Sequence, residues 1–254
     1  MIGCIIQTRM GSSRLPGKVM KKLDGEKTVL DYVVDQISNS KLIDKVIIAT
    51  TNESEDDVIV EFAKKRNLDY FRGNTNDVLD RYYQCAKKFN LQTIVRVTSD
   101  NPLNDPVIID ELIKKFLGEK YDYGTNELKR SFPQGIFGQV YSIETLEKTW
   151  NDAQLPSERE HVSPYIEKNQ NIFKILNLEF GKNISNLRFT IDRESDLIFI
   201  KEIVKKIKKI PVNLEELTRI CKEEPHLIQI NKEHVIDEGY KKSIMDDKEF
   251  LNSN

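Results

Sequence analysis

Short apolar runs alternate with helix-patterned segments through the first 120 residues, and this alternation constrains the fold more than any other feature. The strand-like runs cover residues 3–6, 45–50, 69–71 and 93–98. Segments with apolar residues at helical spacing cover residues 28–40, 55–66, 77–90 and 106–117. Four successive β-α units predict a mainly parallel sheet with helices on both faces, because the crossovers lay helices against the sheet. The sequence therefore predicts an α/β fold.

The pattern becomes less regular after about residue 121. Strands are predicted at residues 138–142, 172–179 and 187–191. Helices are predicted at residues 143–151, 157–168, 194–208 and 213–223. Residues 225–254 are polar and are expected to form a partly ordered C-terminal tail. Because no repeat or linker divides the chain, we expect one domain over residues 1–224, with halves of about 1–120 and 121–224.

The charge balance argues against a nucleic-acid-binding protein. Lys and Arg number 39 against 41 Asp and Glu, so the net charge of −2 provides no global basic field. Three cysteines and three histidines are too scattered to suggest a disulfide framework or a Cys/His metal site. No apolar run reaches the length of a membrane span or a signal-peptide core. We therefore expect a cytoplasmic protein without a nucleic-acid or membrane partner.

The stretch QTRMGSSRLPGK, residues 7–18, follows the first apolar run and combines tight-turn residues with cations. Its cations, which suit phosphate oxygens, are Arg9, Arg14 and Lys18. The stretch matches neither the Walker A motif nor the GxGxxG fingerprint. Ligands bind at the carboxyl ends of parallel strands, so this loop should share one edge with residues 50–52 and 98–100. The loop therefore predicts a site for an anion such as a triphosphate.

The motif IIQTRMGSSRLPGK resembles the opening signature of sugar-activating cytidylyltransferases, above all the spore coat polysaccharide biosynthesis protein F-like branch. That branch is related to 3-deoxy-manno-octulosonate and acylneuraminate cytidylyltransferases. The likeness continues through FRG, RVTSDNP, REHV and EGY and covers nearly the whole chain. It implies a Rossmann-like nucleotidyltransferase fold with a mostly parallel mixed sheet, and a second half elaborated for acceptor binding and dimerisation. It also implies a homodimer that transfers CMP from CTP and releases pyrophosphate in surface polysaccharide biosynthesis.

The resemblance also implies roles for individual residues. Arg9, Arg14 and Lys18 would be catalytic and would hold the β- and γ-phosphates. The nucleotide would further contact Gln7, Thr8, Gly11, Ser12, Ser13, Thr51, Arg72, Thr98 and Ser99. Asp100 and Asp192 follow predicted strands and would hold Mg²⁺ or Mn²⁺, although an aspartate at a strand end also commonly caps a helix. The acceptor candidates are Asn126, Gln134, Arg159, Glu160 and His161.

One segment departs from the branch. Where the branch usually reads P-D-G-L-D, this chain has PQGIF at residues 133–137, so Gln134 and Phe137 replace both acids and point to an altered acceptor. Two acceptor classes stay open. A 3-deoxy-2-ulosonic acid would give a CMP-sugar, whereas a phosphorylated sugar, polyol or amino-acid-like compound would give a CDP-linked product. A non-catalytic nucleotide-binding scaffold is the alternative of another class.

Overall fold

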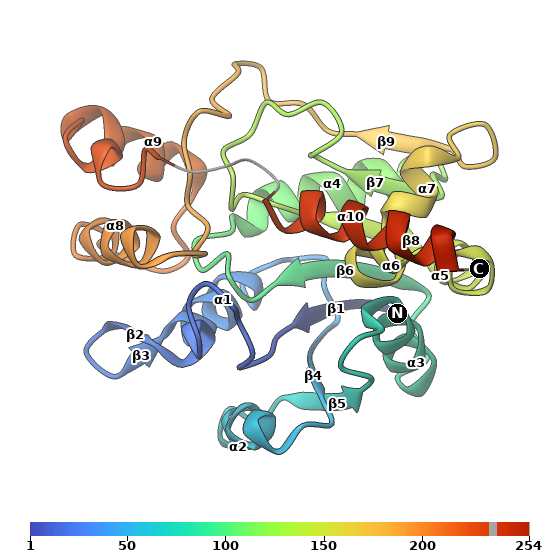
Figure 1. Ribbon diagram of the computed structural model, residues 1–254. Helices are drawn as coiled ribbons and strands as arrows, with labels where there is room; N and C mark the ends of the chain where they lie inside the picture. The colour runs from blue at the N-terminus through green and yellow to red at the C-terminus, as the bar shows by residue number, and fades with distance from the viewer. Residues whose placement is uncertain (234–237, 254) are drawn as a thin grey trace.

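The computed structural model describes residues 1–233 and 238–253, and a seven-stranded sheet forms its centre (Figure 1). The order across the sheet is β5-β4-β1-β6-β8-β7-β9. These strands are β1 (Ile2–Gln7), β4 (Lys45–Thr51), β5 (Asp69–Gly73), β6 (Thr93–Thr98), β7 (Tyr123–Thr125), β8 (Gln139–Ser142) and β9 (Ile175–Asn177). Only β8 runs antiparallel to its neighbours. The predicted mostly parallel α/β sheet is confirmed, and it continues through both halves of the chain.

Helices cover both faces of the sheet because the strands bury side chains on both sides. Along β1, Cys4 and Ile6 join one apolar cluster and Ile5 joins the other. The first cluster includes α1 (Val29–Ile37), α2 (Asp57–Lys65), α4 (Pro106–Gly118), α8 (Glu194–Val204) and α9 (Leu214–Glu223). The second includes α3 (Val78–Lys88), α5 (Ile143–Asp152) and α7 (Pro164–Lys168), beside α6 (Pro156–His161). The expected helices on both faces are therefore present.

Short elements complete the described chain. A two-stranded hairpin is formed by β2 (Lys22–Asp24) and β3 (Lys27–Thr28). Single 3₁₀ turns lie at η1 (Lys18–Met20), η2 (Ser54–Asp56) and η3 (Leu227–Gln229). Within the segment that the sequence assigned to a tail, α10 (Glu238–Ser253) is a helix that crosses in front of α6 (Figure 1). The C-terminal segment therefore contributes to the folded body.

The strand predicted at residues 187–191 does not form. This segment is extended, but within the described part of the chain it forms a single isolated β-bridge, from Arg188 to Gln134. Its N–H groups donate to two different neighbours, from Phe189 to the Gln134 carbonyl at 2.6 Å and from Ile191 to the Asp100 carbonyl at 2.9 Å, so no ladder develops. The segment can lie this close to the loop at residues 134–137 because residue 135 is a glycine. A Cβ at Gly135 would lie 2.5 Å from the Phe189 backbone, and its φ of 94° also favours glycine.

The helix predicted at residues 157–168 is also interrupted. It splits into α6 and α7 at Val162, which has a φ of 72°. Pro164 begins α7 and has no N–H to continue the preceding helix, so the chain must break there. The predicted strand at 172–179 is shorter and survives as β9, and the predicted helix at 194–208 ends at Val204.

The sheet order creates a crevice beside β1. The chain moves from β1 to β4 and β5 on one side and then returns to β6 on the other, so the loops after β1 and β6 diverge. Ligands of open α/β sheets bind at such switch points.

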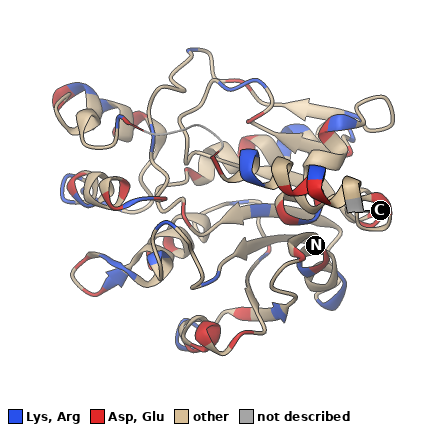
Figure 2. Ribbon diagram, viewed as in Figure 1, with Lys and Arg blue, Asp and Glu red and all other residues tan. Residues whose placement is uncertain are grey.

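Lys, Arg, Asp and Glu are interspersed along the helices (Figure 2). Among the described helices, none has the length and apolarity that crossing a membrane requires.

Candidate active site

A cavity of about 890 Å³ opens at the carboxyl ends of β1 and β6. It is lined by the loop after β1, by residues 98–100 after β6, and by side chains of α6 and α10. A second cavity of about 220 Å³ adjoins it, with residues 134–137 and the segment around Arg188 in its wall. Six residues line both cavities: Arg14, Thr98, Asp100, Asp192, Glu238 and Gly239. The two spaces therefore meet at Asp100 and Asp192.

Lys18 lies where the cavities meet. Its Nζ is 2.9 Å from Asp100 Oδ2, 3.1 Å from Asp192 Oδ1 and 2.7 Å from the carbonyl oxygen of Ile191. Gly17, with a φ of 65°, starts the 3₁₀ turn that presents this side chain, and glycine adopts that conformation at little cost. Burial lowers the pKa of Lys18, but Asp100 and Asp192 outweigh it and raise the pKa above its ordinary value. Lys18 is therefore a charged ammonium between two carboxylates.

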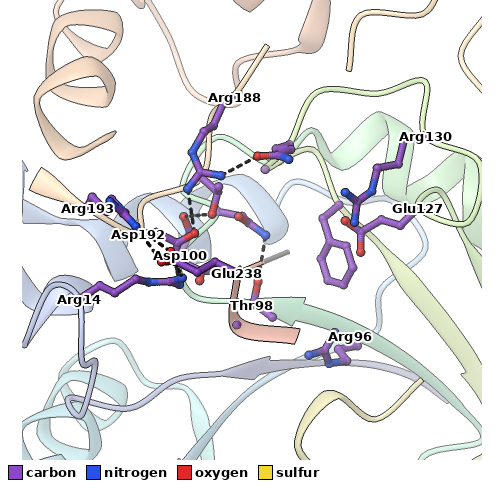
Figure 3. Close-up of a pocket in the computed structure, with 16 residues that line it drawn as sticks. Arg14, Arg96, Thr98, Asp100, Glu127, Arg130, Arg188, Asp192, Arg193 and Glu238 are labelled. Atoms are coloured by element: carbon purple, nitrogen blue, oxygen red, sulfur yellow. Dashed lines mark hydrogen bonds and ion pairs between the residues drawn. The ribbon is translucent and has the colours of Figure 1, made fainter. Parts of the chain in front are cut away.

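Asp192 receives charged hydrogen bonds on both oxygens. Arg14 donates to Oδ1 at 2.6 Å, and Arg188 donates to Oδ2 at 2.8 Å (Figure 3). Burial alone would raise the pKa of Asp192, but Lys18, Arg14 and Arg188 hold it well below its ordinary value. Asp192 is therefore ionised throughout the neutral range.

Asp56 anchors the loop after β1, and the sequence patterns did not single this residue out. Asp56 is fully buried, and its Oδ1 accepts from the backbone N–H of Met10 at 2.7 Å. Its other oxygen accepts from the hydroxyl of Thr51. Thr51 therefore supports the loop through Asp56 and does not line either cavity. The only sequence signal for Asp56 was its place in an acidic first turn.

Most of the residues predicted to bind nucleotide lie together. The large cavity is lined by Gln7, Thr8, Arg9, Gly11, Ser12, Ser13, Arg14, Lys18, Thr98 and Ser99. Arg72 lies elsewhere, since its guanidinium donates to the carbonyls of Thr51 and Glu53 and pairs with Asp57 at 2.6 Å. Arg72 therefore holds the loop after β4 in this structure.

The predicted acceptor residues divide between three places. Arg159, Glu160 and His161 line the large cavity with the opening loop, whereas Gln134 lines the small one. The side chain of Asn126 is buried under the 134–137 loop, where it donates to the Ile136 carbonyl at 2.8 Å and accepts from the Gly138 N–H at 3.1 Å. Asn126 is therefore placed to shape the small cavity from behind.

Asp100 and Asp192 fit a divalent cation on the chemistry of their donors. One oxygen of each faces the same cation, the Lys18 ammonium, at 2.9 Å for Asp100 and 3.1 Å for Asp192, so the two carboxylates lie side by side. The described residues contain no cluster of three or more Asp, Glu, His or Cys side chains that could hold a metal. Magnesium commonly uses one or two carboxylates together with substrate phosphates, so two aspartates are a suitable set.

The C-terminal helix covers the large cavity. Ser243 donates to Glu160 at 2.6 Å and lies 2.9 Å from Nε2 of His161. At the start of the helix, Glu238 accepts from Arg14 at 3.0 Å and from Arg193 at 2.8 Å. The sequence motif EGY indicated this segment, but its position over the opening loop could not be read from the sequence.

Comparison with known proteins identifies the family of this chain. The cytidylyltransferase family profile matches residues 3–233. The chain is 32% identical over 231 residues to the spore coat polysaccharide biosynthesis protein SpsF of Bacillus subtilis, which is 87% of this chain and 94% of SpsF. It is 33% identical over 117 residues to a 3-deoxy-manno-octulosonate cytidylyltransferase of Trichlorobacter lovleyi, which is 46% of this chain and 45% of that protein.

A solved structure is similar over almost the whole chain. It is a cytidylyltransferase from Leptospira borgpetersenii, with a TM-score of 0.87 and 35% sequence identity, covering 92% of this chain and 98% of that one. The resemblance stated from the opening motif is thereby confirmed. The chain belongs to the cytidylyltransferase family and is a nucleotidyltransferase.

Proposed function

We propose that the protein transfers CMP from CTP to a sugar acid or a related small acceptor, with release of pyrophosphate, in surface glycan biosynthesis. The observation that carries this proposal is the meeting of two cavities at Lys18, Asp100 and Asp192. The large cavity, with its basic loop, suits the nucleotide, and the small cavity suits an acceptor. The reacting oxygen and the α-phosphorus would then come together at the two carboxylates.

The side chains of the opening loop suit the departure of pyrophosphate. An acceptor oxygen attacks the α-phosphorus, and the bond from that phosphorus to the bridging oxygen of pyrophosphate breaks. Arg9, Arg14 and Lys18 would stabilise the negative charge on the leaving group. Asp100 and Asp192 would hold Mg²⁺ or Mn²⁺, which when bound offsets charge on phosphate oxygens. Lys18 and Arg14 now pair with carboxylates, so a triphosphate would exchange one set of anionic partners for another.

The charges around the small cavity favour an acceptor with a negative group. Four carboxylates and five arginines line this cavity. The arginines are Arg14, Arg96, Arg130, Arg188 and Arg193. A sugar acid has such a group, and so does a phosphorylated sugar or polyol, which would give a CDP-linked product. The non-catalytic scaffold is less well supported, because a scaffold does not require two carboxylates and an ammonium that converge between the cavities.

Release of pyrophosphate tests the proposal. The protein is incubated with Mg²⁺ and each nucleoside triphosphate in turn, over a panel of sugar acids, sugar phosphates and polyol phosphates. We expect release with CTP alone and only with an acceptor. Asp192→Asn, checked for folding by circular dichroism, should abolish it. Binding of CTP without turnover on any acceptor would support the scaffold instead.

We further propose a homodimer, as the family resemblance implied. The second half of the chain exposes large apolar side chains, with Leu128, Ile172 and Phe180 each about two-fifths to one-half accessible. Such side chains are suited to burial in an interface. Sedimentation velocity should give about 59 kDa, twice the chain mass of 29.6 kDa. A mass of one chain across the micromolar range would contradict this proposal.

A further inference from the structure

Arg96 is a charged side chain in the buried face of a central strand. It lies on β6, between β1 and β8, and is only 7% exposed. Its neighbour Ile94, on the same face of the strand, belongs to an apolar cluster. Burying a guanidinium is costly unless an anion compensates it, so the partners of Arg96 decide how the chain tolerates it.

Among the described residues, the two hydrogen-bond partners of the Arg96 side chain are both neutral. One terminal nitrogen donates to Gln139 Oε1 at 3.0 Å and the other to Gln7 Oε1 at 3.3 Å. Its Nε is buried without a partner. Within the described part of the chain, no carboxylate forms an ion pair with this guanidinium. A guanidinium has five N–H donors, and the described residues accept hydrogen bonds from two of them.

Two aromatic rings hold the guanidinium in place. Its central carbon is 5.7 Å from the centre of the Tyr82 ring and 5.5 Å from that of Phe137. Gln139 is fixed in turn, since it donates to Ser163 Oγ at 3.1 Å and accepts from the Tyr141 hydroxyl at 2.5 Å. Arg96 is therefore preorganised, and little entropy would be lost when it binds an anion.

Arg96 lines one end of the small cavity, and a group of ion pairs lies at the other end of the cavity (Figure 3). Those ion pairs join Arg14 to Asp192 and Arg193 to Glu238. A second unsatisfied group lies in the same wall, because Oδ1 of Asn101 is buried and no described residue donates a hydrogen bond to it. A ligand with an anionic group for Arg96 and a hydroxyl for Asn101 would satisfy both groups.

We infer that Arg96 anchors the anionic group of the acceptor and that Phe137 keeps Arg96 available for it. This inference rests on the proposed transfer reaction and names the class of its acceptor. The position of Phe137 is next to this guanidinium, with 5.5 Å between the ring centre and the central carbon. An acid there would neutralise Arg96, whereas the Phe137 ring holds the cation without removing its charge. The acceptor is thus a hydroxylated compound with a carboxylate or a phosphate, and Phe137 is a specificity-determining residue.

Small anions test the site without knowledge of the full acceptor. The nucleotide cavity is first saturated with α,β-methylene-CTP and Mg²⁺, and the melting temperature is followed against acetate or inorganic phosphate at constant ionic strength. An anion that binds the folded protein raises this temperature. We expect at least one of the two anions to do so in the wild-type protein. A response to acetate alone indicates a sugar acid, and a response to phosphate alone indicates a phosphorylated acceptor.

Matched variants assign the response to Arg96. Phe137→Asp should weaken anion binding by about tenfold or more, because it places a carboxylate beside the guanidinium, whereas Phe137→Leu should change it by less than about threefold. Arg96→Gln, which keeps hydrogen-bonding capacity at this position, should abolish the response. The inference is wrong if neither anion binds the wild-type protein, or if Phe137→Asp and Phe137→Leu behave alike. Failure of the CTP analogue to bind would instead contradict the proposed function.

Discussion

Lys18 and Asp192 organise the charges at the meeting point of the two cavities. The Lys18 ammonium contacts two carboxylates and one carbonyl, so all three of its N–H donors have a partner. Asp192 accepts from Lys18, Arg14 and Arg188. Because the side chains of Lys18 and Asp192 are only 12% and 20% exposed, their charges interact more strongly than those of a fully exposed surface pair. Substitutions here should affect activity far more than substitutions of exposed lysines.

Replacing Lys18 by methionine should reduce kcat about 10²–10³-fold, equivalent to about 3–4 kcal/mol, because one preorganised donor to the leaving group is lost. The measurement is steady-state pyrophosphate release. Lys22→Met is the control, since Lys22 is exposed and its ion pair, at 2.8 Å, is with the exposed Glu26. A Lys18→Met enzyme that keeps its wild-type kcat would show that this ammonium has no role in the chemical step.

Connections between helices depend on a few buried or half-buried carboxylates. Asp105 caps α4 by accepting from the Val107 N–H at 2.8 Å, and it also accepts from the Leu214 N–H at the start of α9 at 2.8 Å. Arg66, at the end of α2, reaches α1, where it pairs with Asp31 at 3.0 Å and with Asp35. These contacts fix how neighbouring helices pack on the sheet.

Asp105→Ala should lower the free energy of unfolding by about 2–4 kcal/mol. Loss of a helix cap costs about 1 kcal/mol, and the buried N–H of Leu214 would lose its acceptor, which costs about 1–3 kcal/mol more. Urea unfolding measures the change. Asn213→Ala is the matched control, since Asn213 caps α9 alone, through the Glu216 N–H at 2.9 Å, and should cost only about 1 kcal/mol. Equal losses in the two variants would argue against the bridging role of Asp105.

Asp35 should make the contact between α1 and α2 sensitive to acid. Burial raises the pKa of Asp35, but Arg66 and Lys27 outweigh it and lower the pKa below its ordinary 3.8. A carboxylate whose pKa is lower in the folded protein contributes its full stabilisation at pH values above its ordinary pKa. This contribution is lost as the pH falls through the pKa of the folded protein. The free energy of unfolding should therefore fall below about pH 5.

Urea unfolding from pH 7 to pH 3 would measure this slope. Asp35→Asn should flatten it, because the substituted side chain cannot titrate. Glu26→Gln, which removes an exposed carboxylate on the β2–β3 hairpin, should leave the slope as in the wild-type protein. An unchanged slope in Asp35→Asn would mean that other carboxylates account for the acid sensitivity.

At the scale of the whole molecule, α10 closes the large cavity over the sheet. The helix is held by Asp247, whose two oxygens accept from Ser157 N–H at 2.8 Å and Ser157 Oγ at 2.6 Å. Glu238 at its other end contacts Arg14 of the opening loop. The first and last parts of the chain thus form opposite walls of one cavity, so movement of α10 would alter access to the opening loop.

Asp247→Ala should loosen α10 without unfolding the sheet. Amide hydrogen exchange within residues 238–253 should become about tenfold faster, because the helix loses both bonds to Ser157, while exchange in β1 stays unchanged. Lys248→Ala, which alters the adjacent exposed side chain, should leave exchange as in the wild-type protein. A uniform increase over the whole chain would instead mean that Asp247 supports global stability.

The sequence by itself determined the β-α alternation, the basic loop after the first strand and the family. These features are local, because a strand, a helix or a tight loop is specified mainly by its own residues and their near neighbours. Gly17 and Lys18 are examples, since their places in a compact loop follow from the motif alone. The extended segment at 187–191 could not be predicted correctly, because strand pairing depends on neighbours that are distant in the sequence.

Only the tertiary structure decided which residues meet. Lys18 contacts the carboxylates of Asp100 and Asp192, which are 82 and 174 residues away in the sequence. Arg14 contacts Glu238, which is 224 residues away. The same applies to Arg96, whose contacts are Phe137 and two glutamines from other strands, while no described carboxylate is within ion-pair distance of it. Such contacts follow from sheet order, strand register and the path of the connecting loops. Those are properties of the packed molecule, and no local segment encodes them.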